Sequence, residues 1–109
     1  MQLNANPQLT AVWHDLIIST TSAHNCTQSD HYVLADATKA AFTVTLPNAS
    51  LCPGKAYTVK KIDSSAHAVT IASANGQTID GATTYSLRSH YNAVDLVSSG
   101  GRWFVTAKL

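Results

Sequence analysis

The stretch YNAVDLVSSGGRWFVT, residues 91–106, has the pattern of a β-hairpin. Apolar and polar residues alternate through Val94–Leu96, as in a strand with one buried and one solvated face. Ser98–Gly101 supplies turn residues, and the aromatic and β-branched residues after it predict the partner strand. Trp103 and Phe104 are adjacent and must point to opposite sides of that strand. We expect one ring in the core and the other on the surface, available for burial between subunits.

Similar short strands are predicted along the rest of the chain. Turn dipeptides such as Pro53-Gly54 and Asn75-Gly76 separate them, while Ser19–Ser29 reads as a polar loop. The further strand candidates are residues 12–18, 32–34, 42–46, 55–62, 69–71, 78–79 and 85–87. Many short strands at this spacing are typical of a sandwich or barrel. The predicted fold class is therefore all-β, a jelly-roll-like β-sandwich of about eight short antiparallel strands.

Composition supports a single β domain with an uncharged surface. The chain has 109 residues, enough for one core, and its six acidic residues are all Asp, which favours turns over helices. Only 12% of residues are charged, so copies repel one another weakly and the surface suits assemblies. A net charge of +1 gives no reason to expect a nucleic-acid or membrane partner. No export signal or apolar run of membrane-spanning length is present.

Residue types that carry chemistry are present but scattered. No two of the five histidines stand at a metal-binding spacing. His24 and Cys26 are two residues apart, so a strand would place them on one face as half of a metal site, but the sequence displays no further ligands beside them. We expect no metal, no cofactor and no catalytic residue. Without an export signal, Cys26 and Cys52 are expected to be free thiols rather than a disulfide.

Other candidate sites have ordinary structural interpretations. The Asp residues mostly sit beside turn residues and are expected to cap turns, so a hydrolase using Asp80 or Asp95 ranks last among the alternatives. The aromatic side chains could stack on sugars in a lectin-like module, but core and subunit contacts are the preferred reading. The sequence therefore predicts a structural or binding protein and not an enzyme.

An ordered series of motifs resembles a module of tailed-bacteriophage structural proteins. It begins with YVLADAT at residues 32–38 and FTVTLP at 42–47, and continues with YTVKKIDSSA at 57–66. The closing motifs are VTI at 69–71, TIDG at 78–81 and GRWFV at 101–105. The resemblance covers about residues 30–106 and carries no catalytic residues. Such modules occur in tail-fibre proteins and in small capsid-associated proteins.

The resemblance implies a homotrimeric virion component. A short stand-alone chain is most similar to a capsid decoration, or cement, protein that is made in the host bacterial cytoplasm and binds the outer surface of the major capsid protein shell. The alternative is a tail-fibre or receptor-binding module that recognises host-surface glycan.

Residues 1–29 depart from the shared pattern and are expected to form an N-terminal arm and first strand, with residues 30–109 as the core module of the same domain. The arm is the candidate partner-binding segment, with an apolar anchor for the capsid at Trp13, Leu16, Ile17 and Ile18. The bulky residues Tyr85, Leu87 and Tyr91 on late strands are the candidates for the trimer interface.

Overall fold

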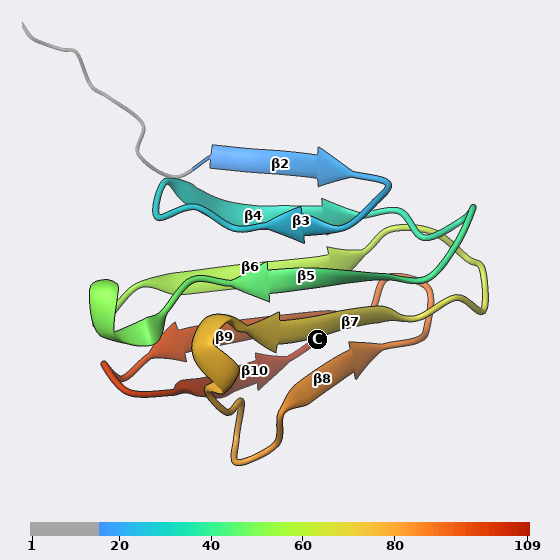
Figure 1. Cartoon of the computed structure of the whole chain (residues 1–109). Helices are drawn as coiled ribbons and strands as arrows, with labels where there is room; N and C mark the ends of the chain where they lie inside the picture. The colour runs from blue at the N-terminus through green and yellow to red at the C-terminus, as the bar shows by residue number, and fades with distance from the viewer. Residues whose placement is uncertain (1–15) are drawn as a thin grey trace, which may run out of the picture.

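The computed structural model describes residues 16–109, which form two facing β-sheets (Figure 1). The five-stranded sheet has the spatial order β10 (Trp103–Lys108), β9 (Ala93–Ser98), β6 (Ala56–Lys61), β4 (Asp30–Ala35) and β2 (Leu16–Thr20). The four-stranded sheet has the order β3 (His24–Asn25), β5 (Phe42–Leu46), β7 (Val69–Ser73) and β8 (Thr84–Leu87). Two 3-10 turns, η1 (Ala49–Leu51) and η2 (Ala74–Gly76), lie in the connections.

From β2 to β7 the chain crosses from one sheet to the other after every strand. Each strand therefore pairs with the strand two places earlier and runs parallel to it, in the series β2, β4, β6 and the series β3, β5, β7. This winding is that of a short β-helix with two strands per coil. The last strands leave the winding: β8 pairs antiparallel with β7, and the β9–β10 hairpin closes the larger sheet against β6.

The all-β class and the two-sheet sandwich are confirmed, but the expectation of antiparallel strands is wrong. Four of the seven strand pairings are parallel, and a jelly roll, which is built from antiparallel Greek keys, does not have this topology. Alternation of apolar and polar residues is the same in both kinds of sheet, so it does not reveal strand direction. Direction follows here from crossings between the sheets, which local turn chemistry does not encode.

The core fills the space between the sheets, and the predicted alternation places it correctly. Val44 and Leu46 of β5 are fully buried, with Phe42 packed against them at the margin. Trp103 is also fully buried and meets the Tyr57 ring edge-on, with ring centroids 5.5 Å apart. Phe104 points outward and is 42% exposed, so the expectation for these neighbouring rings is confirmed.

Local turn predictions also hold. β9 and β10 pair antiparallel across the Ser98–Gly101 turn, in which Ser99 N donates to Arg102 O at 3.0 Å. Asn75 and Gly76 both have positive φ angles, 60° and 65°, as this dipeptide favours. The sequence missed β3, a two-residue strand inside the predicted Ser19–Ser29 loop.

The described part of the predicted N-terminal segment is built into both sheets. β2 forms one edge of the five-stranded sheet and β3 forms the corresponding edge of the four-stranded sheet. Residues 16–25 therefore continue the winding of the core module. Within residues 16–109 the chain forms no helix of the length and apolarity that crossing a membrane requires.

Candidate functional site

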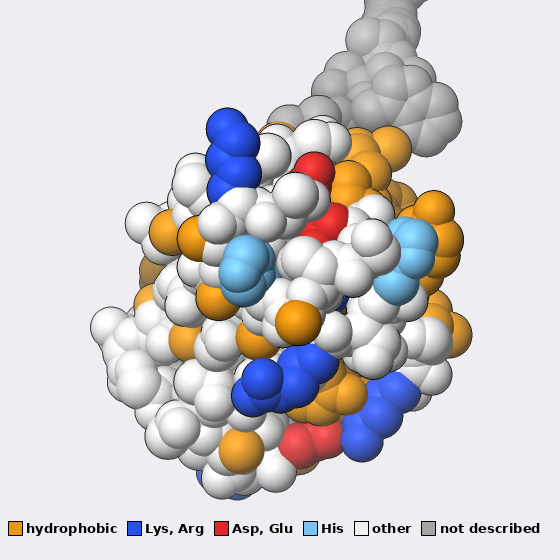
Figure 2. Space-filling model, turned by 90° about the vertical axis from the view of Figure 1, so that its right-hand side faces the viewer, with side chains coloured by type: hydrophobic (Ala, Val, Ile, Leu, Met, Phe, Trp, Pro, Cys, Tyr) orange, Lys and Arg blue, Asp and Glu red, His pale blue; other side chains and the backbone are white. Residues whose placement is uncertain are grey.

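The outer face of the five-stranded sheet, the side away from the other sheet, carries exposed apolar side chains. Ile17 of β2 stands beside Tyr32 of β4, and Val97 of β9 stands beside Phe104 of β10. Ile17 is 65% exposed, Tyr32 and Phe104 are each 42% exposed, and Val97 is half-buried. The two pairs lie on either side of β6, and we call these four residues together the outer apolar patch. Figure 2 shows hydrophobic side chains along the right-hand margin, where this sheet lies in that view.

Polar side chains cross the middle of this face. The Thr58 hydroxyl donates a hydrogen bond of 2.6 Å to Asp95 Oδ1, and the register places both residues in the row that continues from Tyr32. A mixed surface of this kind, apolar with a few satisfied polar groups, resembles the centre of protein interfaces. Asp95, one of the two carboxylates considered for a hydrolase, is thus held by a neighbouring strand. The other, Asp80, accepts from Val105 N at 2.9 Å in a turn.

The structure separates the four residues proposed as the capsid anchor. Trp13 lies outside the described residues, and Leu16 is described only as a backbone position in β2. Ile17 points to the outer face, whereas Ile18 pairs with the buried Val33 on the opposite side of the sheet and is half-buried. Of the described side chains, only Ile17 is well placed to contact a partner.

The three residues proposed for the trimer interface also occupy different environments. Leu87 is 2% exposed and packs in the core of its own chain, so it offers no surface to a neighbour. Tyr85 is half-buried at the core margin, with Lys108 Nζ 5.7 Å from its ring centroid. Tyr91 is 58% exposed, and its ring stacks on His90 with centroids 3.8 Å apart. Tyr91 therefore remains the best-exposed member of the three.

A cluster of metal-ligand types forms where β3 leads back into β4. His24, Cys26 and Asp30 each bring one ligand atom to within 4.8 Å of the other two. His24 Nε2 lies 3.0 Å from Asp30 Oδ2, which also accepts a hydrogen bond of 3.0 Å from Thr27 N. Cys26 and Asp30 are buried, while the His24 side chain is 22% exposed to solvent. His24 and Cys26, which were expected to lie in a polar loop, thus bring their side chains together, and Asp30 joins them.

The pKa values of the two acidic groups of this cluster shift in opposite directions. Burial raises the pKa of the Cys26 thiol to about 12, and the neighbouring Asp30 charge contributes to the rise. Burial would also raise the pKa of Asp30, but hydrogen bonds from Thr27 and His24 outweigh it and lower that pKa. Cys26 and Cys52 are both free thiols in the structure.

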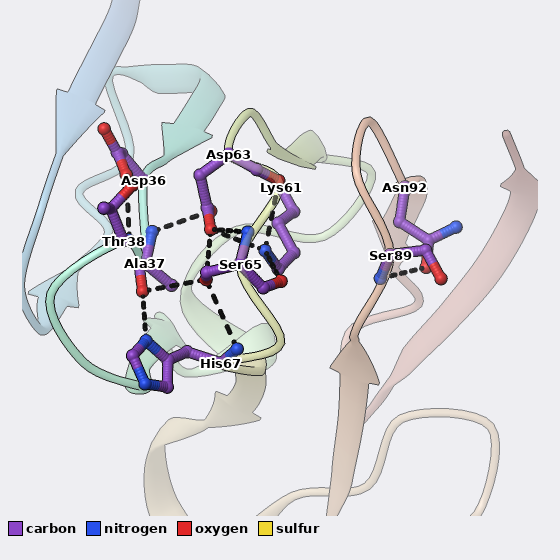
Figure 3. Close-up of polar contacts among 9 residues, drawn as sticks. All are labelled: Asp36, Ala37, Thr38, Lys61, Asp63, Ser65, His67, Ser89 and Asn92. Carbon is purple, nitrogen blue, oxygen red and sulfur yellow. Dashed lines mark hydrogen bonds and ion pairs between the residues drawn. The ribbon is translucent and has the colours of Figure 1, made fainter.

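A second polar cluster is buried at the end of the sandwich, around Lys61 and Asp63 (Figure 3). Lys61 is fully buried, and its Nζ donates to Asp63 Oδ2 at 2.7 Å, to Asp63 O at 3.1 Å and to Ser65 O at 2.9 Å. The Asp63 carboxylate also accepts from Ala37 N at 2.8 Å, from Ser65 N at 3.0 Å and from the Ser65 hydroxyl. All three ammonium protons have acceptors, which is the arrangement of a structural clamp between the β6–β7 and β4–β5 connections.

Sequence reasoning missed Asp30 as a member of the first cluster. The signal was present as the spacing His24-x-Cys26-x-x-x-Asp30, but the path of the four residues 26–29 between β3 and β4 brings the carboxylate back, and the sequence does not specify that path. No protein-family model matches the chain, and no curated protein matches its sequence significantly.

Proposed function

We propose that this chain is a structural protein of a tailed-bacteriophage virion, a decoration protein that binds the outer surface of the major capsid protein shell as a homotrimer and stabilises it. Its place is the capsid surface, after synthesis in the host bacterial cytoplasm. The proposal rests on the resemblance of residues 30–106 to phage structural modules, and on the outer apolar patch as the observation that carries it. Ile17, Tyr32 and Phe104 expose apolar area on one face of a rigid sheet.

The mechanism is binding at many sites at once. A standard protein interface buries about 1,000–2,000 Å² in total, and the outer face of the five-stranded sheet can supply part of that area. A trimer that contacts several capsid subunits links them, and each linkage favours the assembled shell over its dissociated subunits. The low charge of the chain, 12% of its residues, leaves little repulsion against close packing.

Co-sedimentation with undecorated shells of the encoding phage tests the proposal. The wild-type protein is expected to pellet with the shells and to raise their melting temperature. Ile17→Ser is expected to weaken binding by at least about tenfold, because it removes an apolar contact from the patch. Leu51→Ser is the matched control, since Leu51 has the same 65% exposure but lies in η1. Equal binding by both variants, or no binding by the wild type, would sink the proposal.

A second candidate, a tail-fibre or receptor-binding module for host-surface glycan, is favoured by the surroundings of Tyr91. Its exposed ring stacks on His90, and Lys60 Nζ lies 5.1 Å from the ring centroid. Exposed rings beside cationic and polar groups can pack on the apolar faces of sugars. Adhesion to host cells that is lost in Tyr91→Ala, without any binding to shells, would favour this candidate over the decoration protein.

A further inference from the structure

We propose that His24, Cys26 and Asp30 form a binding site for one zinc ion or a similar borderline-soft divalent cation. The site is independent of the capsid surface function, because it lies between β3 and β4 and uses none of the residues of the outer apolar patch. Its ligands would be His24 Nε2, Cys26 Sγ and a carboxylate oxygen of Asp30.

The first argument is geometric. Nitrogen, oxygen and sulfur ligands lie about 2.0–2.3 Å from tetrahedral zinc, so neighbouring ligand atoms stand roughly 3.3–3.8 Å apart. The imidazole nitrogen and the carboxylate oxygen are already 3.0 Å apart, and all three ligand atoms lie within 4.8 Å of one another. Since no separation exceeds 4.8 Å, shifts of about 1 Å among the three side chains reach tetrahedral spacing.

The second argument concerns Cys26 itself. The residue is 8% exposed, and within residues 16–109 its sulfur is not among the side-chain hydrogen-bonding groups. Cys52 differs, because its sulfur donates to Asn48 O at 3.6 Å. The Cys26 sulfur is therefore a buried ligand atom beside an imidazole and a carboxylate, and no other described side chain occupies it.

The third argument is that the surrounding loop is already ordered. Cys26 N donates to Thr45 O at 2.8 Å, and Asp30 N donates to Thr27 O at 3.2 Å. The Tyr57 hydroxyl donates to the same Thr27 O at 2.6 Å, which fixes the loop to the core. A preordered set of ligands loses little conformational entropy on binding. The His24 side chain is 22% exposed, so an ion can approach from its side, and a water molecule would be the fourth ligand.

The donor set selects the class of metal. Imidazole and thiolate favour zinc and its neighbours, whereas magnesium and calcium prefer sites made of oxygen alone. On binding, the Cys26 thiol would lose its proton to solvent, and the resulting thiolate and the Asp30 carboxylate together balance the two positive charges of the cation. The ion would replace the His24–Asp30 contact and tie the short strand β3 to the start of β4.

Titration of the chelator-treated full chain with cobalt and with zinc tests the site. We expect one ion per chain, visible cobalt absorption of tetrahedral intensity with a thiolate-to-cobalt charge-transfer band, and a higher melting temperature with zinc because the ion binds the folded state. Cys26→Ser should remove the charge-transfer band and weaken zinc binding by at least about tenfold. Magnesium at the same concentration should not raise the melting temperature.

Cys52→Ser is the matched control, because it removes the other buried thiol and should leave the cobalt spectrum unchanged. His24→Gln provides a second test at a partly exposed position and should also weaken zinc binding at least about tenfold. Circular dichroism without metal establishes that each variant is folded. A wild-type chain without saturable zinc binding, or a charge-transfer band that survives in Cys26→Ser, would overturn the proposal.

Discussion

Two adjacent lysines of β6 show how much the environment of a single residue matters. Lys60 is half-buried on the outer face, while Lys61 is fully buried and bonded to Asp63. The two-residue period of a strand places adjacent side chains on opposite faces. It does not predict that one of those faces is the interior, because a buried lysine requires an acceptor set that forms only when the β6–β7 connection folds back.

Lys61→Met is expected to lower the free energy of unfolding by about 3–5 kcal/mol, because it leaves the Asp63 carboxylate buried without its cation. Lys60→Met is the neighbouring control. This substitution removes the interaction between Lys60 Nζ and the Tyr91 ring, whose centroid is 5.1 Å away, and should lower the free energy of unfolding by less than about 1 kcal/mol. Urea denaturation of the two variants and the wild type measures both values. Similar losses from the two substitutions would contradict the clamp.

Asp63 should make stability depend on pH at the acid end. Burial would raise its pKa, but hydrogen bonds from Lys61, Ser65 and Ala37 outweigh burial and hold the pKa well below its usual range. A carboxyl whose pKa is depressed in the folded state stabilises the fold above its unfolded pKa, and this contribution is lost as the pH falls toward the folded value.

The wild type should therefore exceed Asp63→Asn in free energy of unfolding by the largest margin above about pH 5, and the margin should shrink as the pH falls below about 4. Chemical denaturation of both proteins across this range measures the margin. A margin that stays constant with pH would show that the carboxyl has the same pKa in the folded and unfolded chains.

At the scale of the strand, alternation decides which substitutions matter. In β7, Ile71 is fully buried and the adjacent Thr70 is half-buried on the other face. Ile71→Ala should cost about 2–5 kcal/mol by creating a cavity, and Thr70→Ala less than about 1 kcal/mol. Thermal and urea unfolding test the difference, and equal losses would mean that the assigned faces are wrong.

The same alternation explains which elements the sequence predicts. Strands of five or six residues such as β5 and β9 repeat the period often enough to be recognised. β3 has two residues and cannot display a period, so its existence depends on pairing with β5. The His24–Cys26–Asp30 cluster was not predicted for a related reason. The sequence indicated a loop at His24 and Cys26, and Asp30 joins them only through the path of that loop.

At the scale of the whole molecule, the proposed homotrimer predicts the mass of the protein in solution. Light scattering is expected to give about three times the chain mass of 11.6 kDa, as the proposed homotrimer requires. Tyr91→Ser should shift the protein toward monomer, because Tyr91 is 58% exposed and is the most accessible of the proposed interface residues. Leu51→Ser, equally exposed elsewhere, should leave the mass unchanged. A monomeric wild type would remove the basis for the trimer.

The sequence by itself determined the all-β class, most strands, their buried faces, the closing hairpin and the opposite orientations of Trp103 and Phe104. These features depend on the two-residue period of a strand and on turn chemistry, both of which act between near neighbours in the chain. Tertiary structure alone decided the parallel winding, the burial of Lys61 and the arrival of Asp30 beside His24 and Cys26. The winding depends on where distant segments return, and a period of two residues is the same whichever way the returning strand runs. The other two features depend on the paths of short connections, which bring Asp63 and Ser65 back to Lys61 and Asp30 back to His24.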